Sequence, residues 1–200
     1  MLKDFFSDLV GGICAGILIS IGGTVFLSCE SKVVGSVLFT VALLTICMQG
    51  YLLYTGKICY LFSSDKKGVS LIFTCLLGNV IGTTVCGLLL SRVLPIGDIA
   101  YTICTSKLTQ EWWQTIVRGI FCGILIYLAV DIFKEKKGIS GIIYCIPVFI
   151  LSGFEHSIAD MFYFAASGIV SFEAFMFLMM VVIGNSIGGF LLPLFSKLRK

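Results

Sequence analysis

Six apolar stretches separated by short polar segments dominate the chain. They cover residues 9–28, 33–62, 69–93, 112–133, 139–166 and 171–195. A transmembrane helix needs about 20 apolar residues, so each stretch predicts one crossing of a bilayer. The second and fifth stretches are too long for one straight helix, and each carries a polar cluster with glycine near its middle. We therefore predict that these two helices are broken, within residues 48–57 and 152–160.

Composition and charge place the chain in a membrane. Hydrophobic residues make up 58% of the sequence and charged residues only 12%, which excludes a soluble domain and predicts a single transmembrane domain over residues 1–200. With the first helix starting inside, nine of the 14 Lys and Arg residues fall on the cytoplasmic side. We expect a multi-pass protein of the inner or plasma membrane with both termini cytoplasmic. This bias also accounts for the net charge of +3, so no nucleic-acid partner is expected.

Internal repetition predicts two copies of a three-helix unit. The segment at 12–19, GICAGILI, recurs at 119–126 as GIFCGILI, and Gly78-Asn79 is echoed by Gly184-Asn185. The copies span about 9–94 and 112–197, and an odd number of crossings per copy requires the second to be inverted. The expected fold is all-α and aquaporin-like, with two inverted repeats and broken second and fifth helices, an architecture of transporters and channels. The nine cysteines show no metal-ligand spacing, so neither a metal nor a cofactor is expected.

Ionisable residues inside these stretches are the first candidates for function. His156, the only histidine, lies in the second break beside Glu155, and an ionisable group at membrane depth is a functional-site hypothesis. Aligning the breaks at their glycines sets Lys57 opposite Asp160, and we expect these two residues to face each other. The alternative is that each binds a backbone group or water. For His156 the alternative is an interior histidine that bonds a carbonyl freed by the break.

The residues of both breaks resemble the formate/nitrite transporter family. The segment 153–161, GFEHSIADM, is similar to the family's signature around its central histidine, and Leu53-Tyr54-Thr55 matches its threonine-bearing loop. Lys107 lies 12 residues before Gly119, where the family has a vestibule lysine. The resemblance covers nearly the whole chain. It implies six-helix protomers assembled as a homopentamer, with one pore in each protomer.

The resemblance also implies roles for individual residues. His156 would be the central pore histidine, Thr55 its hydrogen-bonding neighbour and Lys107 the anion-attracting group outside. The outer hydrophobic constriction would contain Phe39 and Phe149, and the inner one Leu43, Leu53 and Tyr54. Residues expected to stabilise the breaks are Lys57, Asp160, Glu155, Asn79 and Asn185. The chain departs from the family pattern at Tyr54 (usually Phe), at Asp160 (usually Asn), at Lys57 and at Gly123.

A pore of this kind would favour conjugate bases of weak acids. A bare anion loses its hydration at narrow apolar rings at a cost of several kcal/mol or more, whereas a neutral acid does not. Formate, nitrite or hydrosulfide could therefore pass with protonation or a proton relay near His156, whose unperturbed pKa of about 6.5 lies in the useful range. The substrates expected are small monovalent anions or their conjugate acids.

Other interpretations remain at this point. Ser140 and His156 suggest an intramembrane serine protease, but their separation of 16 residues, about 24 Å along a helix, is too long for a catalytic pair. We therefore expect no enzyme and no catalytic residue. A non-conducting membrane scaffold is a third class. Lys107 could be an exposed loop residue beside an interfacial aromatic belt, and Phe39 and Phe149 could face lipid or core.

Overall fold

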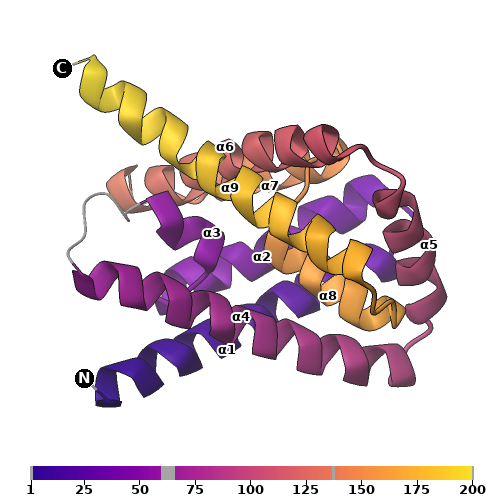
Figure 1. Cartoon of the computed structure of the whole chain (residues 1–200). Coiled ribbons are helices and arrows are strands. Elements are labelled where there is room, and N and C mark those ends of the chain that lie inside the picture. The colour runs from indigo at the N-terminus through magenta and orange to yellow at the C-terminus, as the bar shows by residue number, and fades with distance from the viewer. Residues whose placement is uncertain (1, 60–65, 137, 200) are drawn as a thin grey trace.

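The computed structural model describes residues 2–59, 66–136 and 138–199, and every regular element within them is a helix. The last residues of the second predicted span, 60–62, and two of the predicted cytoplasmic lysines, Lys137 and Lys200, lie outside the described residues. The elements are α1 (Leu2–Ser28), α2 (Lys32–Gln49), α3 (Tyr54–Lys57), α4 (Lys66–Val93), α5 (Gly97–Leu108), α6 (Trp112–Lys136), α7 (Ser140–Leu151), α8 (Ser157–Ser167) and α9 (Phe172–Leu198). Figure 1 shows both termini at the end of the molecule opposite α5.

The predicted spans correspond to these helices, with the two expected interruptions. Within the described residues, five helices (α1, α2, α4, α6 and α9) are long and apolar enough to cross a membrane. The fifth predicted span is divided into α7 and α8, each too short to cross alone, and the second into α2 and the four-residue α3. The breaks in the second and fifth spans are confirmed. Helix α5 lies between the third and fourth spans, where the sequence analysis had assigned no element.

Both breaks begin with the same local structure. Gly50 and Gly153 have left-handed φ angles of 71° and 69°, a conformation that glycine adopts without the steric penalty of a Cβ atom. After Gly50, the Tyr51 N–H donates to the carbonyl of Ile46. After Gly153, the Phe154 N–H donates to the carbonyl of Phe149 in the same way. These bonds close the preceding helix and turn the chain into an extended segment.

Small residues bring the long helices together in two pairs, α1 with α4 and α6 with α9. A Cβ atom built on Gly16 of α1 would lie 2.7 Å from the carbonyl oxygen of Asn79 on α4. In the second pair, a Cβ atom on Gly184 would lie 2.9 Å from the Cα atom of Gly119. Such close backbone approach is typical of helix packing in membranes. The repeated glycine motifs found in the sequence therefore lie at the two tightest helix contacts, and these pairs support the breaks.

Candidate functional site: a histidine between two cavities

Two cavities reach toward the middle of the protein from opposite ends. The α5-side cavity has a volume of about 300 Å³ and is lined by residues that include Phe39, Phe149 and His156. The terminus-side cavity has a volume of about 100 Å³ and is lined by residues that include Leu43 and Leu53. The residues assigned from the sequence to the outer constriction thus line the α5-side cavity. Two of the three assigned to the inner constriction line the other.

His156 is held by one hydrogen bond on each ring nitrogen. Its Nδ1 lies 3.1 Å from the backbone nitrogen of Ala159 and accepts that N–H as the N-cap of α8. Its Nε2 lies 2.9 Å from Oγ1 of Thr55 on α3. Because Nδ1 is an acceptor, these partners place the proton of a neutral ring on Nε2, which donates to Thr55. His156 is 2% exposed and Thr55 1%, so the two breaks meet at this bond, and the histidine does not bond a carbonyl.

Phe39 and Phe149 form an apolar pair next to the histidine. Their ring centroids lie 6.5 Å apart at 86°, an edge-to-face arrangement that aromatic rings prefer. The Phe149 ring also stacks on the imidazole of His156, with centroids 5.7 Å apart. Both phenylalanines are buried, so neither faces lipid. The two rings and the imidazole therefore line the same cavity.

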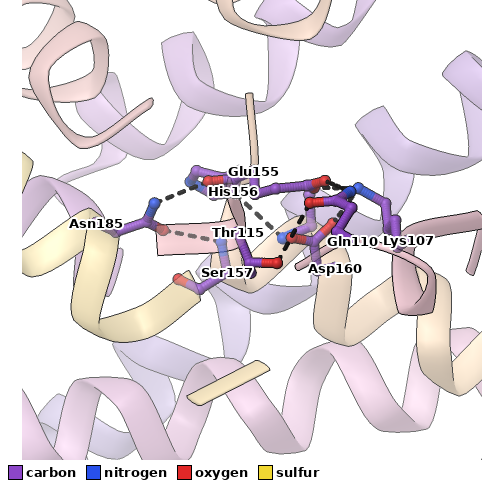
Figure 2. A network of polar contacts seen from close by, with 9 residues as sticks. Lys107, Gln110, Thr115, Glu155, His156, Ser157, Asp160 and Asn185 are labelled. Atoms are coloured by element: carbon purple, nitrogen blue, oxygen red, sulfur yellow. Dashed lines mark hydrogen bonds and ion pairs between the residues drawn. The ribbon is translucent and has the colours of Figure 1, made fainter. Parts of the chain in front are cut away.

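A buried charged cluster lies beside His156, and Figure 2 shows it on the opposite side of the break from Asn185. Lys107 of α5 forms an ion pair with Oε2 of Glu155, and its Nζ lies 3.0 Å from Oδ1 of Asp160. Gln110 donates to the other oxygen of Glu155 at 2.8 Å. Oδ2 of Asp160 is buried without a hydrogen-bond partner. Lys107 is therefore no exposed loop residue, and two carboxylates share its single positive charge.

The expected pairing of Lys57 with Asp160 is wrong. Asp160 pairs with Lys107 and lines the α5-side cavity, whereas Lys57 lines the terminus-side cavity. The two residues occupy matching positions in the two breaks, but the breaks enter the protein from opposite ends. Equivalent positions therefore point toward opposite cavities. The alignment found the equivalence, and the inversion separates the side chains.

Two asparagines tie the breaks to the long helices. Oδ1 of Asn79 accepts the Tyr54 N–H at 2.9 Å, and its Nδ2 donates to the carbonyls of Gly12 and Leu52, both at 2.8 Å. Asn185 repeats this pattern in the second half. Its three partners are the Ser157 N–H at 2.9 Å and the carbonyls of Gly119 at 2.9 Å and Glu155 at 2.8 Å. Each amide thus satisfies backbone groups that a broken helix leaves without partners.

Tyr54 differs from the two other residues assigned to the inner constriction. Its ring is buried, but its hydroxyl lies 2.8 Å from Oγ of Ser186 on α9. Because the Ser186 hydroxyl donates to the carbonyl of Val182 at 2.6 Å, Tyr54 is the donor in this bond. Tyr54 therefore anchors α3 to α9, whereas the wall of the terminus-side cavity contains Leu43 and Leu53.

Several site residues were not found from the sequence. One of them is Gln110, which orients Glu155. The Thr115 hydroxyl donates to Oε1 of Gln110 at 3.3 Å. Arg118 of α6, to which the sequence analysis gave no role, is exposed and lines the α5-side cavity. A polar residue three positions after Lys107 was the only available signal for Gln110. Nothing in the sequence indicated which face of α6 would border the cavity.

Comparison with known proteins gives a consistent result. A family model described as Formate/nitrite transporter matches residues 3–197. The nitrite transporter NirC of Escherichia coli (strain K12) is 28% identical over 173 residues, covering 76% of this chain and 65% of NirC. The formate channel FocA of Haemophilus influenzae is 25% identical over 189 residues, covering 80% of this chain and 66% of FocA. The chain therefore spans about two thirds of the length of these relatives.

Solved structures match the fold over the whole chain. A structure described as an FNT family ion channel has a TM-score of 0.84 and 24% identity, covering 100% of this chain and 90% of that one. A pentameric formate channel with formate bound has a TM-score of 0.78 and 22% identity, covering 98% and 96%. The all-helical fold with interrupted helices is therefore that of these channels.

Proposed function

We propose, because the chain belongs to the formate/nitrite transporter family, that it conducts small monovalent anions of weak acids such as formate, nitrite or hydrosulfide across a membrane. The family consists of transporters and channels, so this multi-pass membrane protein is not an enzyme. We further propose that it works as a homopentamer with one pore per protomer and both termini in the cytoplasm, and that its inverted repeats span about 9–94 and 112–197.

The observation that carries the proposal is the Thr55–His156 hydrogen bond between two cavities. The bond joins the two broken helices at 2.9 Å, with Phe39 and Phe149 on the α5 side and Leu43 on the terminus side. Apolar residues on both sides of one polar pair favour a molecule that is neutral while it crosses and that forms hydrogen bonds at the middle.

The geometry supports different roles for His156, Thr55 and Lys107. Nε2 of His156 donates its proton to Thr55, which leaves the Thr55 hydroxyl hydrogen to donate to a passing oxygen or sulfur. An anion that takes up a proton from water beside these groups becomes a neutral acid and avoids the loss of hydration that a bare ion suffers. In this proposal Lys107 holds Glu155 and Asp160 in place beside the cavity and contributes one of the positive charges of its wall.

The test measures the entry of anions into liposomes that contain the purified protein. Formate, nitrite and hydrosulfide are each offered at two pH values, and the protein should raise the entry of at least one of them above that of empty liposomes. Thr55→Val removes the partner of His156 and should lower the flux roughly two- to tenfold or change its pH dependence, since a buried hydrogen bond contributes about 0.5–1.5 kcal/mol. Thr55→Ser keeps the hydroxyl and should remain close to wild type.

A matched control separates the site from general damage. Thr40→Val makes the same substitution at a half-buried position of α2, where the hydroxyl donates an exposed hydrogen bond to the carbonyl of Val37, and should conduct like wild type. Leakage equal to empty liposomes for every anion would instead support a non-conducting scaffold. A Thr55→Val variant with unchanged flux and pH dependence would remove the Thr55–His156 pair from the mechanism.

A further inference from the structure

Among the described residues, the charged side chains that line the terminus-side cavity are all positive. Two lysines line it, Lys57 of α3 and Lys134 of α6, and no carboxylate does so among the described residues. The α5-side cavity also has two basic residues in its wall, Lys107 and Arg118, but the wall contains two carboxylates as well. The two ends of the pathway therefore differ in charge although the backbone of the two breaks is alike.

Lys57 is one of the two lysines in the wall of this cavity. It is the last residue of α3, two positions after Thr55, and its side chain is half-buried beside Leu53 and Gly56. Its ammonium makes no ion pair or hydrogen bond with any described residue. A half-buried ammonium loses part of its hydration, and a small anion that enters the cavity would stabilise it.

Lys134 of α6 adds the second positive charge to the wall. It lies near the end of α6, is exposed, and has polar contacts of its own. The nearest acidic residues along α6, Asp131 and Glu135, do not line the cavity. The hydroxyl-bearing Tyr51 and the backbone of Gly50 complete the polar part of the wall. A volume of about 100 Å³ accommodates one anion of three or four atoms with little water.

We infer that this cavity is a binding site for one small monovalent anion, with the Lys57 ammonium as its direct partner and Lys134 as the second charge. The inference rests on the proposed function, because it assigns to the pathway a loading site at the terminus side. The site concentrates the anion immediately before the Leu43–Leu53 constriction. Anions entering from the terminus side therefore saturate the pathway at lower concentration than anions entering from the α5 side.

The experiment measures entry from each side separately. The full chain is expressed in a bacterial host without formate channels of its own, and labelled formate uptake is followed in right-side-out and inverted membrane vesicles. Protease access to a C-terminal tag identifies the vesicles in which the terminus side faces the medium. Lys57→Gln removes the charge, Lys57→Arg keeps it, and Lys197→Gln removes an exposed charge near the C-terminal end of α9 that lies outside the cavity.

Lys57→Gln should raise the half-saturating formate concentration from the terminus side by roughly three- to tenfold, as expected for loss of one focusing charge. The maximal rate should not change, and neither should the half-saturating formate concentration for entry from the α5 side. Lys57→Arg and Lys197→Gln should both resemble wild type. In the wild-type protein itself, higher ionic strength should raise the half-saturating formate concentration more for entry from the terminus side than for entry from the α5 side.

Two results would overturn the site while leaving the proposed function intact. One is a conducting wild type whose Lys57→Gln variant saturates like Lys197→Gln from the terminus side. The other is a half-saturating concentration that depends equally on salt for entry from both sides. This measurement uses the wild-type protein alone, so it is available even if Lys57→Gln fails to fold. A wild-type protein that passes no anion from either side would overturn the proposed function and the site together.

Discussion

Replacement of Asn185 tests whether the break in the fifth span depends on one side chain. Its amide makes three hydrogen bonds, to the Ser157 N–H and to the carbonyls of Gly119 and Glu155, and it is fully buried. Asn185→Ala removes all three and leaves buried backbone groups without partners. Each bond contributes about 0.5–1.5 kcal/mol and an unsatisfied buried group costs about 1–3 kcal/mol. We expect a total loss of about 3–5 kcal/mol, since the groups share one site and their effects do not add fully.

Asn185→Asp is the more informative change, because it alters almost no volume. The aspartate keeps an acceptor for the Ser157 N–H, but its second oxygen faces the two carbonyls that the amide now binds. Two favourable contacts become repulsive, and a charge is buried without a counter-ion. This variant should therefore be at least as unstable as Asn185→Ala, although by shape it is the closer substitute.

The assay is thermal unfolding in detergent, followed by fluorescence-detected size exclusion of the tagged protein. For a chain of this length, about 2–4 °C of Tm is lost per kcal/mol, so both variants should melt roughly 6–20 °C below wild type. Thr40→Ala loses one exposed local hydrogen bond and should change Tm by no more than about 2 °C. The reasoning fails if Asn185→Asp melts within 3 °C of wild type, roughly the change that 1 kcal/mol produces.

Two further predictions concern the charged cluster and the helix contacts. Lys107→Met leaves the carboxylates of Glu155 and Asp160 buried without a cation and should destabilise the protein by about 3–5 kcal/mol. Adding Asp160→Asn to that variant should recover part of the loss in the same melting assay. Strictly additive effects of the two substitutions would contradict the shared ion pair. Gly16→Ala should prevent correct packing of α1 on α4, because its Cβ atom would lie 2.7 Å from a backbone carbonyl. At Gly97 the nearest neighbour of a Cβ atom is 3.7 Å away, so Gly97→Ala should give the same size-exclusion profile as wild type.

The sequence predicted the membrane fold and its breaks because these follow from local rules. Hydrophobic length determines where a helix can cross, and a polar cluster with glycine inside an overlong span leaves few alternatives to a break. The asparagines at 79 and 185 were found by repetition, and their hydrogen bonds show why the motif occurs twice. Gly123 lies against the same motif, since a Cβ atom there would collide with the backbone of Asn185.

The partners of the charged residues could not be predicted in the same way. Lys107 lies on a short helix whose position depends on how the third and fourth spans pack, so its ion pair with Asp160 is a tertiary contact with no local signal. Lys57 was given the wrong partner because the alignment identifies equivalent positions but says nothing of which cavity each one faces. Arg118 required knowledge of which face of α6 borders the cavity.

The helix cap formed by His156 limits how this side chain can handle protons. A histidine that passes protons onward usually takes one at one nitrogen and releases another from the opposite nitrogen. Here Nδ1 is occupied by the Ala159 N–H for as long as α8 keeps its first turn. The neutral ring therefore carries a single proton, on Nε2, and losing it would leave an imidazolate anion in a buried site. His156 thus serves as the hydrogen-bond donor that orients the Thr55 hydroxyl, and the proton that neutralises a passing anion comes from water.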